Sequence, residues 1–553
     1  MRIQVMLSTL LAVAAAVPEA KALNTNREEV VAFFSENVYG VRPDLSRFAK
    51  RQEVVACTND PVFRAVRKTV ELNVMTPWGE RTFRAEAFIP RRADGRRPPV
   101  FAYIAFRQPA ELLKRPIAMS TPSGRWPVEQ ILARGCATVA FRYEDVFSDD
   151  KAKTRGWATD PKRPADGWGA ISAWALAASR VMDWLETEPS VDASRVAVVG
   201  LSRLGKTALW AGATDPRFAY VVIDESGSMG ARVSRCNVRG ETIDAITRNF
   251  PHWFAPNCRA KFLGRDGEMP IDQDSLVAAC APRLLTISSA EDDEWSCPAG
   301  EHLSFESARS AWGAHTDRAH YFFRRGPHEL RHDDWADYLD FAASHGWMEL
   351  DGSWCSCGTS ITWYNSHRGG FEKGYQDCVR ETLGFSSMTN CGINGSCVRA
   401  IPKDLPRCDW YTIEHGINDW GHSTPVGTWA DYANPGTNRT FFAGYRRFID
   451  RIREVNPAAK IILCTPRRGY GFRTYLPKTS DDEKNGIRLF EYAQAVREIA
   501  YREGFEIADF FAEAGEDAEL AVLSIDLALH PNTRGFRLMS DILVRAFLRA
   551  NRR

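Results

Sequence analysis

Residues 196–206 have the sequence VAVVGLSRLGK, in which an apolar run stops at a glycine and a serine precedes a new apolar pattern. The run predicts a buried strand, and the spacing Gly200-x-Ser202-x-x-Gly205 predicts a sharp turn into a helix over 206–212. Such a turn holds a serine hydroxyl at the carboxyl end of a strand, where unpaired N–H groups of the helix can stabilise an oxyanion. Ser202 is therefore a candidate nucleophile, and the alternative is a serine in an ordinary strand-to-helix turn.

Strands and helices alternate outward from this stretch. Apolar runs predict strands at 70–74, 83–89, 100–106, 137–143, 196–199, 220–223, 283–288 and 320–323. Amphipathic or helical patterns lie at 28–36, 170–185, 206–212 and 335–344. This rhythm predicts an α/β fold with a mostly parallel sheet covered on both faces, whose sites lie at the carboxyl ends of the strands.

A second, smaller α/β unit begins near Met348. Its predicted strands are 353–357, 411–414, 460–464 and 506–510, and its predicted helices are 441–455, 486–503 and 537–549. A chain of 553 residues is too long for one core. We therefore expect an N-terminal domain over residues 23–347 and a C-terminal three-layer α/β domain over residues 348–553.

The start of the chain predicts export. Arg2 precedes an apolar run over 5–17, and Ala20-Lys21-Ala22 fits a small-x-small cleavage site. The run is too short to cross a bilayer, and no later segment is long enough. We expect a secretory signal over residues 1–22 with cleavage near Ala22, and a secreted or periplasmic protein.

Charge and cysteine content narrow the range of partners. The 71 basic and 70 acidic residues nearly balance, which argues against a nucleic acid or an anionic membrane as partner. Thirteen cysteines in an exported protein predict disulfides, with at least one thiol left over. Cys355-x-Cys357 lacks a second pair or a histidine at ligand spacing, so it does not predict a zinc site.

Candidate partners for Ser202 follow later strands in the order acid, then histidine. Glu225 and Asp293 each come after a predicted strand, and His328 comes after the next one. Serine hydrolases of the α/β type use this chain order. The histidine takes the serine proton, and the carboxylate fixes the histidine tautomer and stabilises the imidazolium. Taken singly, each acid is more typical of a solvated loop, but their shared position after successive strands favours a triad.

Six short motifs occur in order along the N-terminal half. They are WG at 168–169, VGLSRLGK at 199–206, DESG at 224–227, NFPHWF at 249–254, EDDEW at 291–295 and GPH at 326–328. Through these motifs, residues 24–346 resemble the glucuronoyl esterases of carbohydrate esterase family 15. The resemblance implies an α/β-hydrolase fold and cleavage of the ester between 4-O-methylglucuronic acid on xylan and lignin alcohols.

The same resemblance implies a role for several side chains. Ser202 would be the nucleophile, His328 the base and Arg203 an oxyanion donor. The residues that hold the uronate hydroxyls would be Lys206, Glu241 and Trp295. Without the resemblance, Lys206 would be a helix-surface lysine and Trp295 a core aromatic residue.

The family places its acid after either of two strands, and this chain has a carboxylate at both positions. We favour Glu225 as the triad acid because Glu225-Ser226-Gly227 matches the fungal-type position closely. Asp293 is the alternative, and the sequence does not decide between the two.

A second serine follows a predicted strand in the C-terminal unit. The motifs there are GTSITW at 358–363, NCGING at 390–395, EHGIND at 414–419 and LHPN at 529–532. Through them, residues 348–553 resemble the SGNH (GDSL-type) hydrolases, which have a flavodoxin-like α/β/α fold. The resemblance implies Ser360 as nucleophile, His530 as base, and Gly395 and Asn418 as oxyanion donors beside the serine N–H.

One position departs from the SGNH pattern. The acid of that family usually lies three residues before the histidine, where this chain has Leu527, and the nearest carboxylate is Asp526. Three outcomes stay open: Asp526 takes the place of the acid, the site works as a Ser–His dyad, or activity is weakened. A degenerate domain kept for packing or glycan binding is the corresponding alternative.

Together these features predict an exported, bifunctional carbohydrate esterase. The N-terminal domain would hydrolyse 4-O-methylglucuronoyl esters between xylan and lignin, and the C-terminal domain would deacetylate xylan or xylo-oligosaccharides. Both reactions would pass through acyl-enzyme intermediates without a metal or cofactor. The expected partners are glucuronoxylan and lignin–carbohydrate esters. The alternatives are an N-terminal esterase for acetylated xylan and a non-catalytic, carbohydrate-binding C-terminal module.

Overall fold

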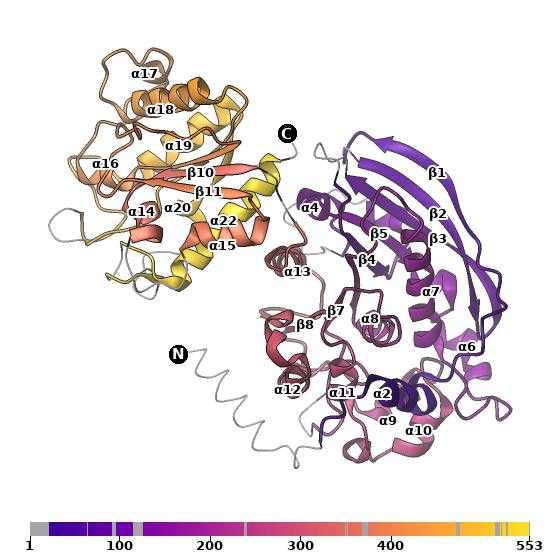
Figure 1. Ribbon diagram of the computed structural model, residues 1–553. Coiled ribbons are helices and arrows are strands. Elements are labelled where there is room, and N and C mark those ends of the chain that lie inside the picture. Colours follow the sequence, from indigo (N-terminus) through magenta and orange to yellow (C-terminus); the bar gives the residue numbers. More distant parts are fainter. Residues whose placement is uncertain are drawn as a thin grey trace. The chain divides into compact units, whose positions relative to one another are not determined.

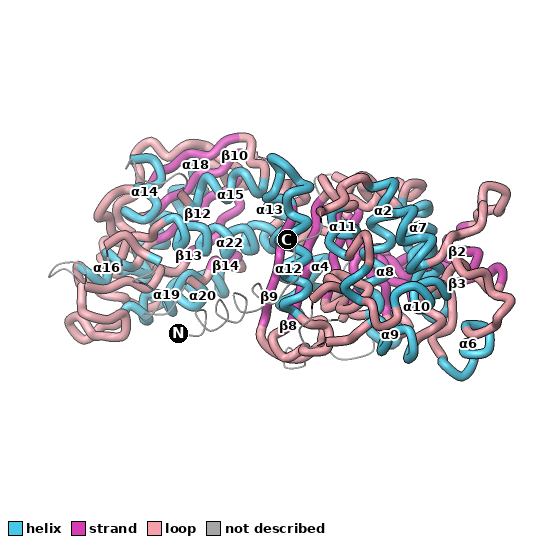
Figure 2. Tube along the Cα trace, turned by 90° about the horizontal axis from the view of Figure 1, so that it is seen from below, coloured by secondary structure: helices cyan, strands magenta, loops and turns pink. Residues whose placement is uncertain are grey.

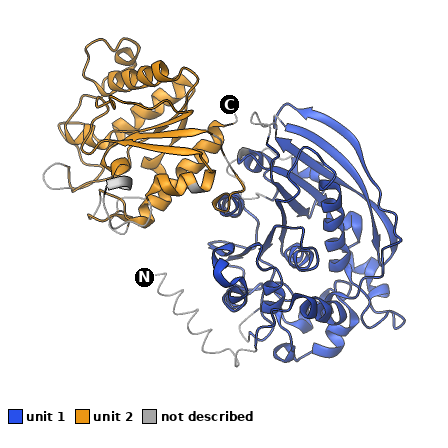
Figure 3. Ribbon diagram, in the orientation of Figure 1, with its two compact units in different colours: residues 1–342 blue, residues 343–553 orange. Residues whose placement is uncertain are grey.

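The computed structural model describes residues 22–63, 65–90, 96–113, 125–236, 240–348, 350, 352–367, 374–471, 476–514, 520, 523–526 and 529–551. The chain divides into two compact units, residues 1–342 and residues 343–553, each described here by itself (Figure 3). Nearly all of the predicted signal segment, and Leu527, lie outside the described residues.

Unit 1 is built on one nine-stranded sheet (Figure 1). Its strands are β1 (Gln52–Asp60), β2 (Ala65–Thr76), β3 (Gly79–Pro90), β4 (Val100–Ala105), β5 (Ala137–Arg142), β6 (Val196–Leu201), β7 (Tyr220–Asp224), β8 (Leu284–Ala290) and β9 (Ala319–Arg324). Their order in the sheet is β1-β2-β3-β5-β4-β6-β7-β8-β9. The pairs from β1 to β5 are antiparallel, and those from β5 to β9 are parallel. The mostly parallel sheet predicted from the alternation is confirmed.

The helices of unit 1 cover both faces of this sheet. They are α2 (Arg27–Phe34), α3 (Pro109–Leu113), α4 (Val128–Ala133), α5 (Tyr143–Val146), α6 (Lys151–Ala158), α7 (Ala170–Leu185), α8 (Arg203–Thr214), α9 (Ile243–Asn249), α10 (Pro256–Phe262), α11 (Gln273–Ala278), α12 (Pro298–Ala308) and α13 (His332–Ser344). Turns of π or 3-10 type lie at 35–39, 266–268 and 309–318.

Alternation along the central strands explains the two covered faces, since successive side chains of a strand point to opposite sides. Val198 and Ile223 face the core cluster that includes α7 and α8. Phe101 and Tyr103 instead pack edge-on against Trp335 of α13. These strands are apolar on both faces, as expected for parallel strands between two helical layers.

Unit 2 has a five-stranded parallel sheet in the order β11-β10-β12-β13-β14. The strands are β10 (Ser353–Gly358), β11 (Ser387–Gly392), β12 (Trp410–Glu414), β13 (Lys460–Cys464) and β14 (Glu506–Ala508). The predicted strand 506–510 is too long, because the Asp509 side chain accepts a hydrogen bond from Ala512 N and starts a helix.

The helices of unit 2 form a layer on each face of its sheet, seen as cyan tubes around the magenta strands in Figure 2. They are α14 (Ser360–His367), α15 (Tyr375–Leu383), α16 (Ile417–Gly421), α17 (Trp429–Ala433), α18 (Phe441–Val455), α19 (Leu489–Glu503), α20 (Phe510–Glu513) and α22 (Thr533–Ala550). Helices α15 and α22 pack on one face, and α18 and α19 on the other, which confirms the three-layer α/β/α arrangement. Within the described residues, no helix of either unit combines the length and apolar character that a membrane span requires.

The thirteen cysteines, all within the described residues, form no disulfide, so the prediction of disulfides was wrong for this structure. Most of the cysteines are buried. The Sγ atoms of Cys355 and Cys357 are 3.6 Å apart, well beyond the S–S bond length of about 2.05 Å. A buried cysteine packs as a small apolar residue, so core packing explains most of them.

Candidate active sites

The Ser202 turn lies at the carboxyl end of β6, in the middle of the large sheet. Ser202 precedes α8 with φ of 62° and ψ of −125°, a backbone conformation that residues other than glycine rarely adopt. A Cβ at Gly200 would lie 1.9 Å from the Leu204 carbonyl oxygen, so only glycine fits there. The Ser202 N–H donates to the Asp224 carbonyl at 2.8 Å. Close packing thus fixes a strained turn that presents the serine, as in a nucleophile elbow.

Arg203 opens the first turn of α8, where backbone N–H groups have no partner inside the helix. Its guanidinium forms an ion pair with the buried Asp149 and lies 5.0 Å from the centre of the Trp253 ring. Asp149 also accepts hydrogen bonds from His252 Nε2 at 2.8 Å and from Trp253 Nε1 at 2.5 Å. Burial alone would raise the pKa of Asp149, but these donors and Arg203 lower it. Asp149 therefore anchors Arg203 as an ionised carboxylate; the sequence contained no motif that singled it out.

His328 follows β9 and faces two carboxylates at one ring nitrogen. Its Nδ1 lies 2.6 Å from Asp293 Oδ2 and 2.9 Å from Glu225 Oε2. Both acids are buried, whereas 39% of the His328 side chain is exposed. The structure thus brings both candidate acids to the same histidine. Among the described residues no hydrogen bond joins the Ser202 hydroxyl to His328; catalytic hydrogen bonds often tighten only when substrate binds.

The surroundings of the two acids move their pKa values in opposite directions. Burial raises the pKa of Glu225, against the opposing effects of His328 and Arg324. Burial alone would also raise the pKa of Asp293, but the hydrogen bond from His328 outweighs it and lowers the pKa of Asp293 below its usual range. For His328 itself, partial burial lowers the pKa, and the hydrogen bonds to Asp293 and Glu225 outweigh it and raise the pKa to about 9. Asp293 is therefore the more readily ionised acid.

Ligand atoms of Glu225, Asp293 and His328 lie within 4.8 Å of one another, a spacing that a metal ion could use. However, the Arg324 guanidinium donates to Glu225 Oε1 at 2.5 Å, and the Glu329 N–H donates to Glu225 Oε2 at 2.9 Å. A cation bound there would meet an existing positive charge and an occupied carboxylate. The two carboxylates are better suited to orienting His328 than to holding a metal ion.

Lys206, Glu241 and Trp295 lie together beside this centre. Lys206 is buried and its Nζ donates to the Ser226 carbonyl oxygen. Burial lowers the pKa of Lys206, and the charge of Glu241 opposes this effect. Burial raises the pKa of Glu241, against the effects of Lys206 and of a hydrogen bond from Trp295. The Trp295 side chain is 57% exposed, so Trp295 is not the core aromatic residue of the alternative interpretation.

Two buried acids that the sequence did not single out support these turns. Glu301 accepts hydrogen bonds from Ser226 Oγ at 3.0 Å, Gly227 N at 2.9 Å and Ser289 Oγ at 2.6 Å. In unit 2, Glu414 accepts from Thr359 N and Oγ1, in the turn just before the second serine. Burial raises the pKa of each acid to about 7.

The second serine stands in a continuous hydrogen-bonded line of three side chains. Ser360 begins α14 directly after β10, and its Oγ lies 3.0 Å from His530 Nε2. The other ring nitrogen, Nδ1, is hydrogen-bonded to Asp526 Oδ2. Asp526 Oδ1 also accepts the backbone N–H groups of Leu529 and His530, at 3.2 Å and 2.8 Å. Asp526 therefore occupies the place of the expected acid, one residue earlier in the chain than the usual pattern.

The expected oxyanion donors of unit 2 lie at the ends of neighbouring strands. Asn418 Nδ2 donates to the Ser396 carbonyl at 3.0 Å, and the Ser396 hydroxyl donates to the Gly358 carbonyl at 3.4 Å. Gly395, next to Ser396, has a φ of 72°, which suits glycine. These contacts bring the turn at Gly395 and the start of α16 to the strand that ends before Ser360.

Buried Arg467 supports the histidine segment of unit 2 and was not found from the sequence. Its Nη1 donates to the Leu529 carbonyl at 3.2 Å and to Ser524 Oγ at 3.3 Å. Burial lowers the pKa of Arg467 to about 10, against the effect of Asp526.

Comparison with known families matches the two units separately. Residues 108–315 match the family described as "Glucuronyl esterase, fungi", and residues 357–538 match the "GDSL-like Lipase/Acylhydrolase family". The first match contains the Ser202 turn and both candidate acids but ends before His328. The second match contains Ser360, Asp526 and His530.

Similar proteins match the N-terminal part of the chain. Carbohydrate esterase MZ0003, from an unknown prokaryotic organism, is 36% identical over 252 residues, 41% of this chain and 58% of that protein. The 4-O-methyl-glucuronoyl methylesterase of Podospora anserina is 30% identical over 191 residues, 32% of this chain and 40% of that protein. The chain thus spans less than two thirds of the length of these relatives. A solved glucuronoyl esterase from Solibacter usitatus is 33% identical with a TM-score of 0.50, over 57% of this chain and 91% of that structure.

Proposed function

The chain belongs to the glucuronoyl esterases of carbohydrate esterase family 15 over its N-terminal unit and carries a GDSL-like lipase/acylhydrolase domain in its C-terminal unit, and from this premise we propose a bifunctional carbohydrate esterase. Both families consist of carboxylic ester hydrolases. The proposed domains are residues 23–347 and 348–553. The observation that carries the proposal is the presence of two separate serines on strand-to-helix turns, with a histidine paired to a carboxylate in each unit.

In the N-terminal domain, Ser202 attacks the ester carbonyl carbon while His328 accepts the serine proton. The oxyanion that forms is stabilised by the free N–H groups at the start of α8, with Arg203 held in place by Asp149. His328 then protonates the departing alcohol, and water hydrolyses the acyl-enzyme in a second, equivalent step.

We assign the role of triad acid to Asp293 rather than to Glu225, which the sequence favoured. Asp293 makes the shorter contact to His328 Nδ1, and its lowered pKa keeps it ionised to stabilise the imidazolium. Glu225 is shared with Arg324 and the Glu329 N–H, so it mainly holds the loop that carries the histidine.

The proposed substrate of this domain is the ester of 4-O-methylglucuronic acid on xylan with a lignin alcohol. Support comes from Lys206, Glu241 and Trp295, which offer a cation, a carboxylate and an exposed ring beside Ser202 and so suit the hydroxyls and the face of a sugar. The match to 4-O-methyl-glucuronoyl methylesterases supports the same acyl group. An acetyl group has neither hydroxyls nor a ring face for these three side chains to bind, which argues against the acetylxylan alternative.

Hydrolysis of benzyl glucuronate tests this assignment. We expect the full chain to release benzyl alcohol and the Ser202→Ala variant to release none above background. Ser194→Ala, a change in an exposed turn, is the matched control and should keep the wild-type rate. Cleavage of acetylated sugars by Ser202 without cleavage of the glucuronate ester would overturn the assignment.

For the C-terminal domain we propose removal of acetyl groups from xylan or xylo-oligosaccharides. The hydrogen bonds from Ser360 to His530 and from His530 to Asp526 support catalysis rather than a binding or packing role. A non-catalytic module has no need of a histidine held between a serine and a carboxylate. The test is acetate release from acetylxylan by the full chain and by Ser360→Ala. A Ser360→Ala protein that still releases acetate at the wild-type rate would refute this role, and retained xylan binding without any acetate release by either protein would favour the binding module.

We propose that the protein is exported, as the segment at residues 1–22 predicts, and that it meets its substrates in the plant cell wall. Both proposed reactions remove esters from the same polymer, so a single chain places the two activities on one substrate.

A further inference from the structure

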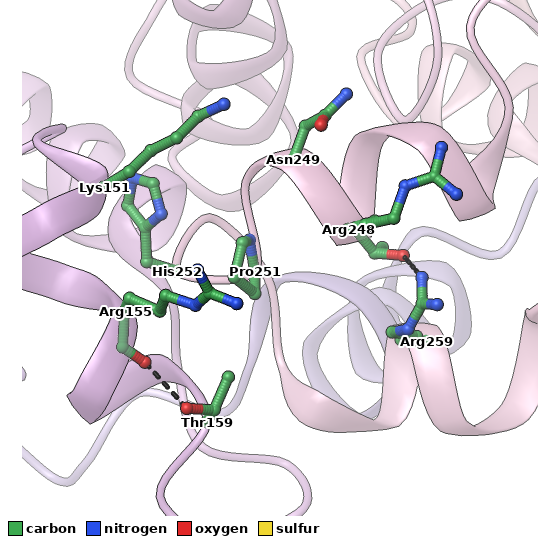
Figure 4. A pocket seen from close by; sticks show the side chains of 9 residues that line it. Lys151, Arg155, Thr159, Arg248, Asn249, Pro251, His252 and Arg259 are labelled. Carbon is green, nitrogen blue, oxygen red and sulfur yellow. Dashed lines mark hydrogen bonds between the residues drawn. The ribbon is translucent and has the colours of Figure 1, made fainter.

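A cavity of about 420 Å³ lies in unit 1. Figure 4 shows side chains of α6 and the turn after it on one side, those of α9 and α10 on the other, and Pro251 and His252 between them. The nine lining residues are Lys151, Arg155, Thr159, Thr247, Arg248, Asn249, Pro251, His252 and Arg259. Four of the nine are cations and none is a carboxylate, so the cavity favours an anion.

The charges at this cavity are only partly compensated. Arg248 and Arg259 share one carboxylate, Asp244, at 3.0 Å and 2.9 Å. Within the described residues, Lys151 and Arg155 have no carboxylate within ion-pair distance. A concave surface lined by one sign of charge concentrates the opposite charge from solution. Arginine guanidinium groups in addition suit the planar, two-pronged shape of a carboxylate.

One of the lining residues also carries a buried polar atom without a partner among the described residues. His252 is fully buried, and its Nδ1 has no hydrogen-bond partner among the described residues, while its Nε2 is bound to Asp149. An unsatisfied buried nitrogen is costly unless something binds it. Because Nε2 donates to Asp149, Nδ1 is left as an acceptor, so a ligand hydroxyl that donates to it would satisfy it.

Two further contacts connect the cavity to the first active centre. Phe250 lies between them: the Lys151 ammonium is 4.5 Å from the centre of its ring, and the Arg203 guanidinium is 5.6 Å from the same point. His252 and Arg203 also bind the same carboxylate, Asp149. The cavity is therefore a neighbour of the residue that follows Ser202.

We propose that this cavity is a secondary binding site for a free uronate carboxylate of the same glucuronoxylan chain whose ester reaches Ser202. The inference rests on the proposed function of the N-terminal domain. Lys151 and Arg155 bind the carboxylate, and Arg248 and Arg259 add positive charge. A hydroxyl of the same sugar donates a hydrogen bond to His252 Nδ1. Unesterified uronates of the polymer then anchor the chain beside the site that cleaves its esters.

Binding of de-esterified glucuronoxylan to the full chain tests the proposal, with Ser202→Ala and Ser360→Ala present throughout to prevent turnover. We expect Lys151→Ala with Arg155→Ala to weaken binding about tenfold, since two charged hydrogen bonds are lost at an exposed site. The weakening should vanish in high salt, which screens these charges. Lys153→Ala is the matched control on the same helix, because Lys153 pairs with Asp150 and does not line the cavity.

Three results would overturn the proposal. They are equal weakening by Lys153→Ala, equal weakening of binding to neutral arabinoxylan, or unchanged glucuronoxylan binding by the double variant while inorganic phosphate binds the cavity. This third result would make the cavity a site for small anions. Failure of the wild-type chain to cleave benzyl glucuronate would remove the proposed esterase function, yet it would leave the binding comparison intact, so the two failures are distinguishable.

Discussion

Isosteric substitutions can distinguish the contributions of the two carboxylates at His328 Nδ1. Asp293→Asn removes the closer, ionised acid and leaves Glu225 at 2.9 Å. In serine hydrolases, aspartate-to-asparagine at the triad costs about 10⁴-fold in kcat. Because the second carboxylate remains here, we expect a smaller loss, about 10² to 10³-fold, for benzyl glucuronate.

Glu225→Gln should affect the fold more than the rate. The Arg324 guanidinium is almost fully buried, with Glu225 and Asp334 as its two carboxylate partners. Breaking one buried pair leaves charge uncompensated, so we expect a loss of about 3 kcal/mol in the free energy of unfolding. Asp293 still orients His328, so we expect kcat of the folded protein to fall only about tenfold.

The assays are initial rates across pH and thermal unfolding of each variant. His328 must be neutral to accept the serine proton, so with its pKa raised to about 9 the wild-type kcat/KM should rise with pH up to about that value. Removing the Asp293 charge lowers the pKa of His328. The rising limb of the kcat/KM profile against pH should therefore move to lower pH in Asp293→Asn. Asp292→Asn, at the exposed neighbouring position, is the control and should change neither rate nor limb. A larger rate loss for Glu225→Gln than for Asp293→Asn in folded protein, or an unmoved limb, would refute the assignment of the acid.

Three other changes test individual elements. Asp526→Asn should lower acetate release by about 10³ to 10⁴-fold in kcat, because His530 loses its orienting charge; a loss under tenfold would instead indicate a dyad. Gly200→Ala should cost about 3 kcal/mol or more in urea unfolding, because its Cβ would meet the Leu204 carbonyl; wild-type stability would contradict the packing of the turn. Ser202→Gly should abolish glucuronate hydrolysis yet raise unfolding stability by about 1 kcal/mol, since glycine relieves the positive φ; a loss of stability would show that the turn is unstrained.

Burial decides which elements the sequence could predict. The helices at 170–185 and 441–455 agree with the structure at both ends, because the first is buried along nearly its whole length and the second has a long apolar stripe with clear periodicity. By contrast, β1 and β11 were not predicted. Both lie at the edges of their sheets and carry mostly exposed or half-exposed side chains, so neither has an apolar pattern to recognise.

The candidate sites show the same limit. Chain order and motifs located both serines and histidines, because the turns that hold them need glycine and small residues at fixed spacing. They favoured Glu225 over Asp293, whereas we propose Asp293, since the choice depends on Arg324, which shares no motif with either acid. Nor did they place Asp526, whose fit depends on how the chain turns between it and His530 so that two backbone N–H groups reach one carboxylate oxygen.

The central claim is that one chain holds two independent ester-hydrolysing serines. Its most direct test measures benzyl glucuronate cleavage and acetate release from acetylxylan in the same samples of wild type, Ser202→Ala and Ser360→Ala. The account predicts that Ser202→Ala loses only glucuronate cleavage and Ser360→Ala loses only acetate release. Loss of both activities in one variant with the fold intact, or acetate release that depends on Ser202, would contradict it.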